Sequence, residues 1–377
     1  VVTDDTLEEA PKFQTPPRIR WYRSEIDRDV LMSLTARSNL RAFVHVFCHL
    51  GLFFATGLLT YLAFRLINGG TWHWAVPVTL AGLFAHGTHG LFLGLVAVHE
   101  LGHKTPFKTR FWNEFFMRVY AFLSWSDFVW FQPSHVKHHQ ATVHDQHDGE
   151  VVLPALLDFK DWQFWMTAFA LNPKNVWVRL VSWSKHSMGR IDGDWYNHVL
   201  PASDEKLRQR HRNWARIVLF GHLALAIIFI VTGHWFLIIV FNFGTMYCSW
   251  LGILCGTPQH FGMSPNVPDF RLCCRTFTCA WLPAFCYWNM QYHIEHHMYP
   301  AVPFYNLPKL RKVLIDDLPP APHGLWATWK EILQIHRRQC ADSAYRFVPE
   351  LPGNTGTHVA DEVLEREAAL SDCGQRD

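Results

Sequence analysis

Four long apolar stretches limit the fold of this chain more than any other feature of its sequence. They cover Ala42–Phe64, Trp74–Val98, Trp214–Val231 and Trp235–Cys255, in a chain of 377 residues. An α-helix needs about 20 mainly apolar residues to cross a bilayer, and a span must satisfy its own backbone hydrogen bonds. We therefore predict an all-α membrane protein with four transmembrane helices arranged as two hairpins.

Positive charge is distributed unevenly around these stretches. The two predicted hairpin turns lack Lys and Arg, except for Arg65 near the outer end of the first span. The positive-inside rule then places both termini and both large polar segments in the cytosol. The predicted regions are a cytosolic N-terminal arm (1–41), a first hairpin (42–98), a cytosolic and interfacial region (99–213), a second hairpin (214–255), a second cytosolic region (256–351) and a flexible acidic tail (352–377).

Three further apolar segments are too irregular or too short to be read as simple spans. Phe111–Phe131 and Trp162–Leu171 are aromatic and weakly periodic, and we expect interfacial or re-entrant helices there. Arg271–Trp288 is interrupted by Arg275 and Pro283, which favours an interfacial segment. The alternative is a fifth span, which would place the chain after residue 288 on the other side of the membrane.

The chain contains 24 His, and eight of them fall in three short motifs. HELGH begins at His99, HVKHH at His135 and HIEHH at His293. Helical residues i, i+3 and i+4 share a face, and neutral imidazole is the commonest side-chain metal ligand. One tetrahedral zinc ion takes four ligands, so eight predict more than one metal ion. The predicted ligands are His99, His103, His135, His138, His139, His293, His296 and His297.

Two other functions fit part of this pattern. HELGH alone is the HExxH signature of a zinc peptidase, with Glu100 as general base. Ile191-Asp192-Gly193 is similar to the element that supplies the third ligand of site-2-type intramembrane peptidases, but it lies in a polar segment and leaves two motifs unused. A non-enzymatic metal sensor or carrier fits the number of histidines but does not predict their spacing.

In this order, around two hairpins, the motifs resemble the histidine boxes of the integral-membrane fatty acid desaturase and hydroxylase superfamily, over roughly residues 40–315. The resemblance implies two iron ions in a non-haem centre, dioxygen as co-substrate, and a cytosolic helical cap that holds the metal site. It implies a ninth ligand, for which His260 in GTPQHFG is suitably placed. Acidic residues that would orient ligating imidazoles are Glu100, Asp145, Asp148, Glu150 and Glu295.

The resemblance also implies a substrate class. Three residues separate the histidines of HELGH, one fewer than in typical acyl-CoA desaturases, which favours acyl-lipid, sphingolipid-type or other relatives. The predicted function is a dioxygen-dependent desaturase that inserts a double bond into an acyl chain. A lipid or alkyl hydroxylase, a ketolase and a decarboxylase are alternatives within the superfamily, and HELGHK is similar to the first box of membrane alkane hydroxylases.

Such an enzyme needs two electrons per turnover. The sequence has no HPGG-type cytochrome b5 motif, so we expect a separate donor of the ferredoxin, rubredoxin or cytochrome b5 type, and no nucleic-acid partner. The compact form fits a bacterial cytoplasmic membrane with the histidines facing the cytosol. Basic residues beside the motifs fit a docking face for an acidic donor or an ordinary positive-inside surface. They are Lys104, Lys108, Arg110, Lys137, Lys309, Arg311 and Lys312.

Overall fold

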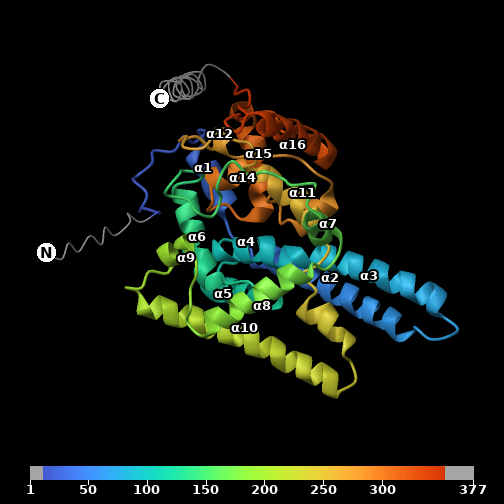
Figure 1. Cartoon of the computed structure of the whole chain (residues 1–377). Coiled ribbons are helices and arrows are strands. Elements are labelled where there is room, and N and C mark those ends of the chain that lie inside the picture. Colours follow the sequence, from blue (N-terminus) through green and yellow to red (C-terminus); the bar gives the residue numbers. More distant parts are fainter. Residues whose placement is uncertain (1–11, 353–377) are drawn as a thin grey trace.

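A computed structural model describes residues 12–352 of the chain, so the predicted tail falls almost entirely outside the described residues. The described part is helical and contains isolated β-bridges but no strand. Figure 1 shows long helices along one side of the molecule and shorter helices gathered above them. The shorter α-helices are α1 (Arg28–Thr35), α5 (Arg110–Leu123), α6 (Phe128–Gln140), α7 (Trp162–Phe169), α8 (Pro173–Ser187), α9 (Asp194–Val199), α11 (Trp250–Gly256), α12 (Phe270–Cys273), α13 (Trp281–Cys286), α14 (His293–Met298), α15 (Leu307–Leu314) and α16 (Gly324–Ala341).

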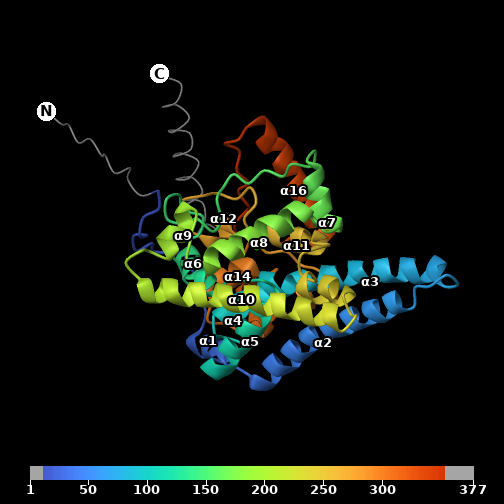
Figure 2. The ribbon, with the colours of Figure 1, turned by 60° about the horizontal axis from the view of Figure 1, so that its bottom comes forward.

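Three helices are long and apolar enough to cross a membrane: α2 (Asn39–Arg65), α10 (Glu205–Val231) and a continuous helix over Trp72–Gly102. The last consists of α3 (Trp72–Phe92), a π-helical turn (Leu93–Ala97) and α4 (Val98–Gly102). Figures 1 and 2 both show α2 and α3 running side by side away from the short helices. Large apolar side chains on these helices are exposed, as expected for a surface that meets lipid.

The fourth predicted span is not a single helix. The segment forms a short π-helical turn (Ile238–Asn242), a non-helical stretch, and then α11. The stretch lies against α3 so closely that a Cβ on Gly90 would come within 2.2 Å of the Gly244 carbonyl oxygen. The backbone amide of Cys248 then bonds to the carbonyl oxygen of Ala170, just after α7. These long-range contacts replace helical hydrogen bonds, so a count of four spans is not confirmed.

The segment Arg271–Trp288 is not a fifth membrane helix. It forms the short helices α12 and α13 with non-helical backbone between them. Arg275 is buried between them, with its Nε 2.8 Å from a carboxylate oxygen of Glu331. A buried guanidinium with an ionic partner belongs inside a protein rather than in lipid, so this segment is part of the short-helix layer.

The histidine motifs lie on three helices of this layer and its boundary. HELGH occupies α4 and its C-cap, HVKHH the end of α6, and HIEHH most of α14. The π-helical turn directly precedes α4, and such turns are frequent at functional sites. A Cβ on Gly94 in that turn would come within 2.8 Å of Ser126 Oγ, so the small residue lets the segment before α6 approach.

Candidate metal centre

The histidine motifs, far apart in the sequence, meet in space and form two groups of potential ligands. Within each group, one ligand atom per residue lies within 4.8 Å of every other. The larger group contains His99, His103, His135, His139 and His296. The smaller group contains His260, Cys274, His293 and His297.

In each group, imidazole Nε2 atoms face one another at short range. In the larger group, His135 Nε2 lies 3.1 Å from His103 Nε2 and 3.0 Å from His139 Nε2. In the smaller group, His293 Nε2 lies 2.9 Å from His260 Nε2 and 3.1 Å from His297 Nε2. The outer nitrogens of these rings therefore converge.

These separations fit a shared metal ion. At a metal–nitrogen distance of about 2.1 Å, neighbouring ligands lie about 3.0 Å apart around a six-coordinate ion and about 3.4 Å apart around a tetrahedral one. Among the described residues, His296 has no hydrogen-bond partner for either ring nitrogen, although it is only 1% exposed. Buried polar atoms rarely stay unpaired, so the donor set present here suits metal ions.

Carboxylates hold the inner nitrogens of three motif histidines. Glu100 lies 2.9 Å from His99 Nδ1 and Glu150 lies 2.7 Å from His135 Nδ1. The second oxygen of Glu150 accepts a hydrogen bond from Ser134, whose hydroxyl oxygen accepts one from the indole of Trp195. A histidine that donates from Nδ1 keeps the lone pair of Nε2 for a metal ion.

His138 is held by the third carboxylate. Its Nδ1 lies 2.7 Å from Asp148 Oδ2, and that oxygen also accepts the backbone N–H of Val143 at 2.8 Å. The ring centroid of His138 lies 5.2 Å from that of His260 and 5.0 Å from that of His297. His138 thus stands beside the smaller group. Burial lowers the pKa of His138, but the Asp148 charge and hydrogen bond outweigh it and raise the pKa overall.

The smaller group includes one histidine that was predicted from its position and one residue that was not predicted at all. His260 donates from Nδ1 to the Cys273 carbonyl oxygen at 2.9 Å, which leaves Nε2 free to face His293. Burial lowers the pKa of His260 to about 3, so the ring is neutral, as a metal ligand must be. Cys274 is fully buried beside it. No cysteine motif in the sequence marks this position, because the contact arises from folding alone.

Comparison with known families gives this arrangement its context. The sequence model of the fatty acid desaturase family matches residues 70–329, which is more than half of the chain and includes all nine predicted histidines. The chain belongs to the fatty acid desaturase family. A comparison with curated proteins found no match. Membership implies an oxidoreductase that acts at a membrane on a lipid or acyl substrate.

Two acidic residues of this desaturase family member, Asp145 and Glu295, were expected to orient ligating imidazoles but have other partners. Asp145 is exposed, and its Oδ2 accepts a hydrogen bond from Asn266 rather than from a histidine. Glu295 is buried in α14, where it accepts hydrogen bonds from Thr276 and Arg311. Neither carboxylate therefore holds a ring nitrogen of a described motif histidine.

Two other expectations for this desaturase family member concern a docking face for an electron donor and a peptidase-type ligand. Arg311 is buried and pairs with Glu295 at 3.0 Å, so it is not available to a docking partner. Asp192, the third ligand of the peptidase alternative, is exposed and its carboxylate lies 2.5 Å from Lys185 Nζ. It belongs to neither ligand group, so HELGH has no peptidase-type partner at that position.

Proposed function

We propose that this protein is a dioxygen-dependent di-iron desaturase that inserts a double bond into the acyl chain of a lipid. One observation supports this more than any other: two groups of buried or half-buried histidines, with converging outer nitrogens, lie next to each other. The rings of His139 and His297, one from each group, are stacked with their centroids 4.2 Å apart. Two ions held by these groups would be neighbours in a single centre.

In this proposal the larger group binds one iron ion, and His260, His293 and His297, together with His138, bind the other. Imidazole is a suitable ligand for iron. Each of these histidines, including His138 with its raised pKa, would bind as a neutral ring, so the metal charge would be balanced by oxygen ligands. When bound, the two ions would activate dioxygen so that hydrogen can be removed from an unactivated C–H bond.

The residues of the chain would prepare this centre and protect it. Burial and neighbouring histidines hold the pKa values of His293, His296 and His297 well below the usual range, so these rings are neutral and each keeps one nitrogen lone pair for a metal. Glu100, Asp148 and Glu150 would fix three ring orientations. The low exposure of the site would exclude bulk water, which would otherwise react with an activated oxidant.

The remaining parts of the proposal concern partners and location. We propose a multi-pass protein with the histidines on the cytosolic side, in a bacterial cytoplasmic membrane. A separate ferredoxin, rubredoxin or cytochrome b5 would supply electrons. The long helices with exposed apolar faces support insertion in a bilayer, and Lys104, Lys108 and Lys137 would offer positive charge to an acidic donor.

The test is lipid profiling of cells that express the protein with a matched redox partner, combined with metal analysis of protein reconstituted with iron. We expect about two irons per chain that are lost when the motif histidines are substituted, together with new unsaturated acyl chains. His138→Ala should abolish product formation, whereas Asp145→Asn, which alters an exposed carboxylate away from the histidines, should not. Retained activity in His138→Ala would remove that residue from the proposed ligand set.

The same experiment separates the alternatives. Hydroxylated, oxidised or shortened products without unsaturation would replace the desaturase proposal with the hydroxylase, ketolase or decarboxylase alternative. One zinc ion per chain, with peptide cleavage and no lipid product after iron reconstitution, would favour the peptidase. Metal binding without any lipid product or peptide cleavage would favour a sensor or carrier.

A further inference from the structure

A third set of potential metal ligands lies outside the histidine motifs. Asp127 comes from the N-cap of α6, His186 from α8 and His211 from α10. One ligand atom from each lies within 4.8 Å of the others. All three side chains are buried, and His211 is only 1% exposed. Buried ionisable groups of this kind need partners or a metal ion.

The ligand atoms are close together but are not aligned with one another. His211 Nε2 lies 2.7 Å from Asp127 Oδ2. Even so, neither atom makes a hydrogen bond of acceptable geometry to any described residue, and His211 Nδ1 is also unpaired. Both buried atoms therefore lack a partner among the described residues, and a metal ion could satisfy both of them. A hydrogen-bonded Asp–His pair would align them.

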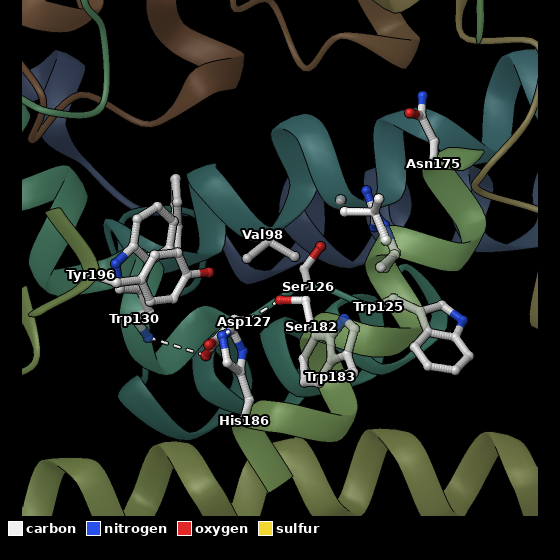
Figure 3. A pocket seen from close by; sticks show the side chains of 14 residues that line it. Val98, Trp125, Ser126, Asp127, Trp130, Asn175, Ser182, Trp183, His186 and Tyr196 are labelled. Atoms are coloured by element: carbon white, nitrogen blue, oxygen red, sulfur yellow. Dashed lines mark hydrogen bonds between the residues drawn. The ribbon is translucent and has the colours of Figure 1, made fainter. Parts of the chain in front are cut away.

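The other contacts of the cluster leave its ligand atoms available. Asp127 Oδ1 accepts the backbone N–H of Trp130 at 3.2 Å and caps α6, so Oδ2 is the oxygen that remains. His186 Nε2 has one long contact, 3.5 Å to the hydroxyl of Ser182 one turn earlier in α8. Figure 3 shows Asp127 and His186 side by side, with these two contacts drawn.

A cavity adjoins the cluster and gives it access from outside. Its volume is about 510 Å³, and its lining includes Asp127, His186, Trp130 and Tyr196 (Figure 3). Phe131 also lines the cavity, and its ring stacks on His135 with the centroids 5.0 Å apart. The cluster is therefore separate from the two motif groups, and Phe131 lies between the cavity and His135.

We propose that Asp127, His186 and His211 form a third, mononuclear site for a divalent transition-metal ion, with an open coordination position that faces the cavity. Two imidazoles and one carboxylate with an open position are typical of non-haem Fe²⁺ and of catalytic Zn²⁺ sites. The ion would join α8 and α10 to the start of α6, the helix that carries His135, His138 and His139. This inference goes beyond the proposed function and does not depend on it.

The test compares the metal content of the purified full-length protein with that of single variants. His186→Ala and His211→Ala should each lose one metal ion per chain. Because only the difference of one ion counts, incomplete loading of the motif histidines does not affect the result. His222→Ala is the matched control: His222 is also buried on α10, but its Nε2 bonds to the Phe122 carbonyl oxygen at 2.9 Å. This control should keep the full metal content.

A second variant covers the case in which the alanine variants fold poorly. Asp127→Asn keeps a side-chain oxygen that can cap α6 but removes the charge that binds the ion. Added Zn²⁺ should raise the thermal midpoint of the metal-depleted wild type more than that of Asp127→Asn, because a ligand that binds the folded state stabilises it. Fe²⁺, added without oxygen, is the second probe.

Two results would overturn the proposal. One is an equal metal content in the wild type, His186→Ala and His211→Ala. The other is an equal effect of Zn²⁺ and of Fe²⁺ on the thermal midpoints of the wild type and Asp127→Asn. Either result would leave the cluster as a buried Asp–His contact that fastens α10 to α6.

Discussion

Two populations of buried histidine occupy neighbouring parts of this protein, and their nitrogens are used differently. In the long helices, His86 Nε2 bonds to the Val240 carbonyl oxygen at 3.0 Å, and His89 Nε2 bonds to the His49 carbonyl oxygen at 2.9 Å. In the motifs, the Nε2 atoms of residues such as His135 and His139 face each other at 3.0 Å. Both populations are buried, except that His103 and His139 of the motifs are half-buried.

The comparison shows that burial and histidine content do not by themselves define a metal site. A histidine whose outer nitrogen donates to a backbone carbonyl fastens one segment to another and has no lone pair directed at a ligand. A histidine whose inner nitrogen is held by a carboxylate keeps the outer lone pair free. What distinguishes the motif histidines is therefore the partner of each nitrogen, which can be tested by substitution.

The largest effect is expected from His135→Ala. His135 has two close Nε2 neighbours and a carboxylate on Nδ1, so its loss removes a central member of the larger group. We expect turnover to fall by more than the roughly 100-fold that loss of a partner of a ligand can cost, together with a loss of iron measured per chain. Full iron content in this variant would show that the larger group is not a binding site.

A smaller effect is expected from Glu150→Gln, which keeps the size of the side chain but removes the charge beside His135. Loss of such a partner typically weakens metal binding about 10–100-fold. The measurement is iron retention against a chelator, followed by turnover after reloading with excess iron. Asp145→Asn is the matched control, because Asp145 is an exposed carboxylate in the same loop that bonds to Asn266. Equal iron retention in the two variants would remove Glu150 from this role.

Much of the site could be predicted because its spacing is local. The i, i+3 and i+4 positions of HVKHH and HIEHH place their rings on one face of α6 and α14 wherever those helices lie. Asp145 and Asp148 show the limit of this reasoning. They are three residues apart in one loop, and only the turn geometry, with Asp148 held by the amides of Val143 and Glu150, decides which one reaches His138.

The long helices of the fold could be predicted from the sequence, but the break in the fourth apolar stretch could not. Hydropathy identified α2, the Trp72–Gly102 helix and α10 because each is a continuous apolar run. It could not identify the break between Phe243 and Ser249, which depends on the contact of Gly90 with Gly244. The positions of Cys274 and of the Asp127–His186–His211 cluster likewise come from segments that meet only in the folded chain.

The smallest effect on turnover is expected from His89→Leu, although this side chain is as buried as the motif histidines. The substitution approximately keeps the volume and removes the hydrogen bond from His89 Nε2 to the His49 carbonyl oxygen, which should cost about 0.5–1.5 kcal/mol of folding free energy. A lower thermal midpoint in detergent, with unchanged iron content and turnover after equal loading, is the expected result. Loss of iron without loss of thermal stability in this variant would contradict the contrast between the two populations of histidine, because His89 would then behave like His135. The distinction between the two kinds of buried histidine therefore depends on His135→Ala losing iron and turnover while His89→Leu loses only thermal stability.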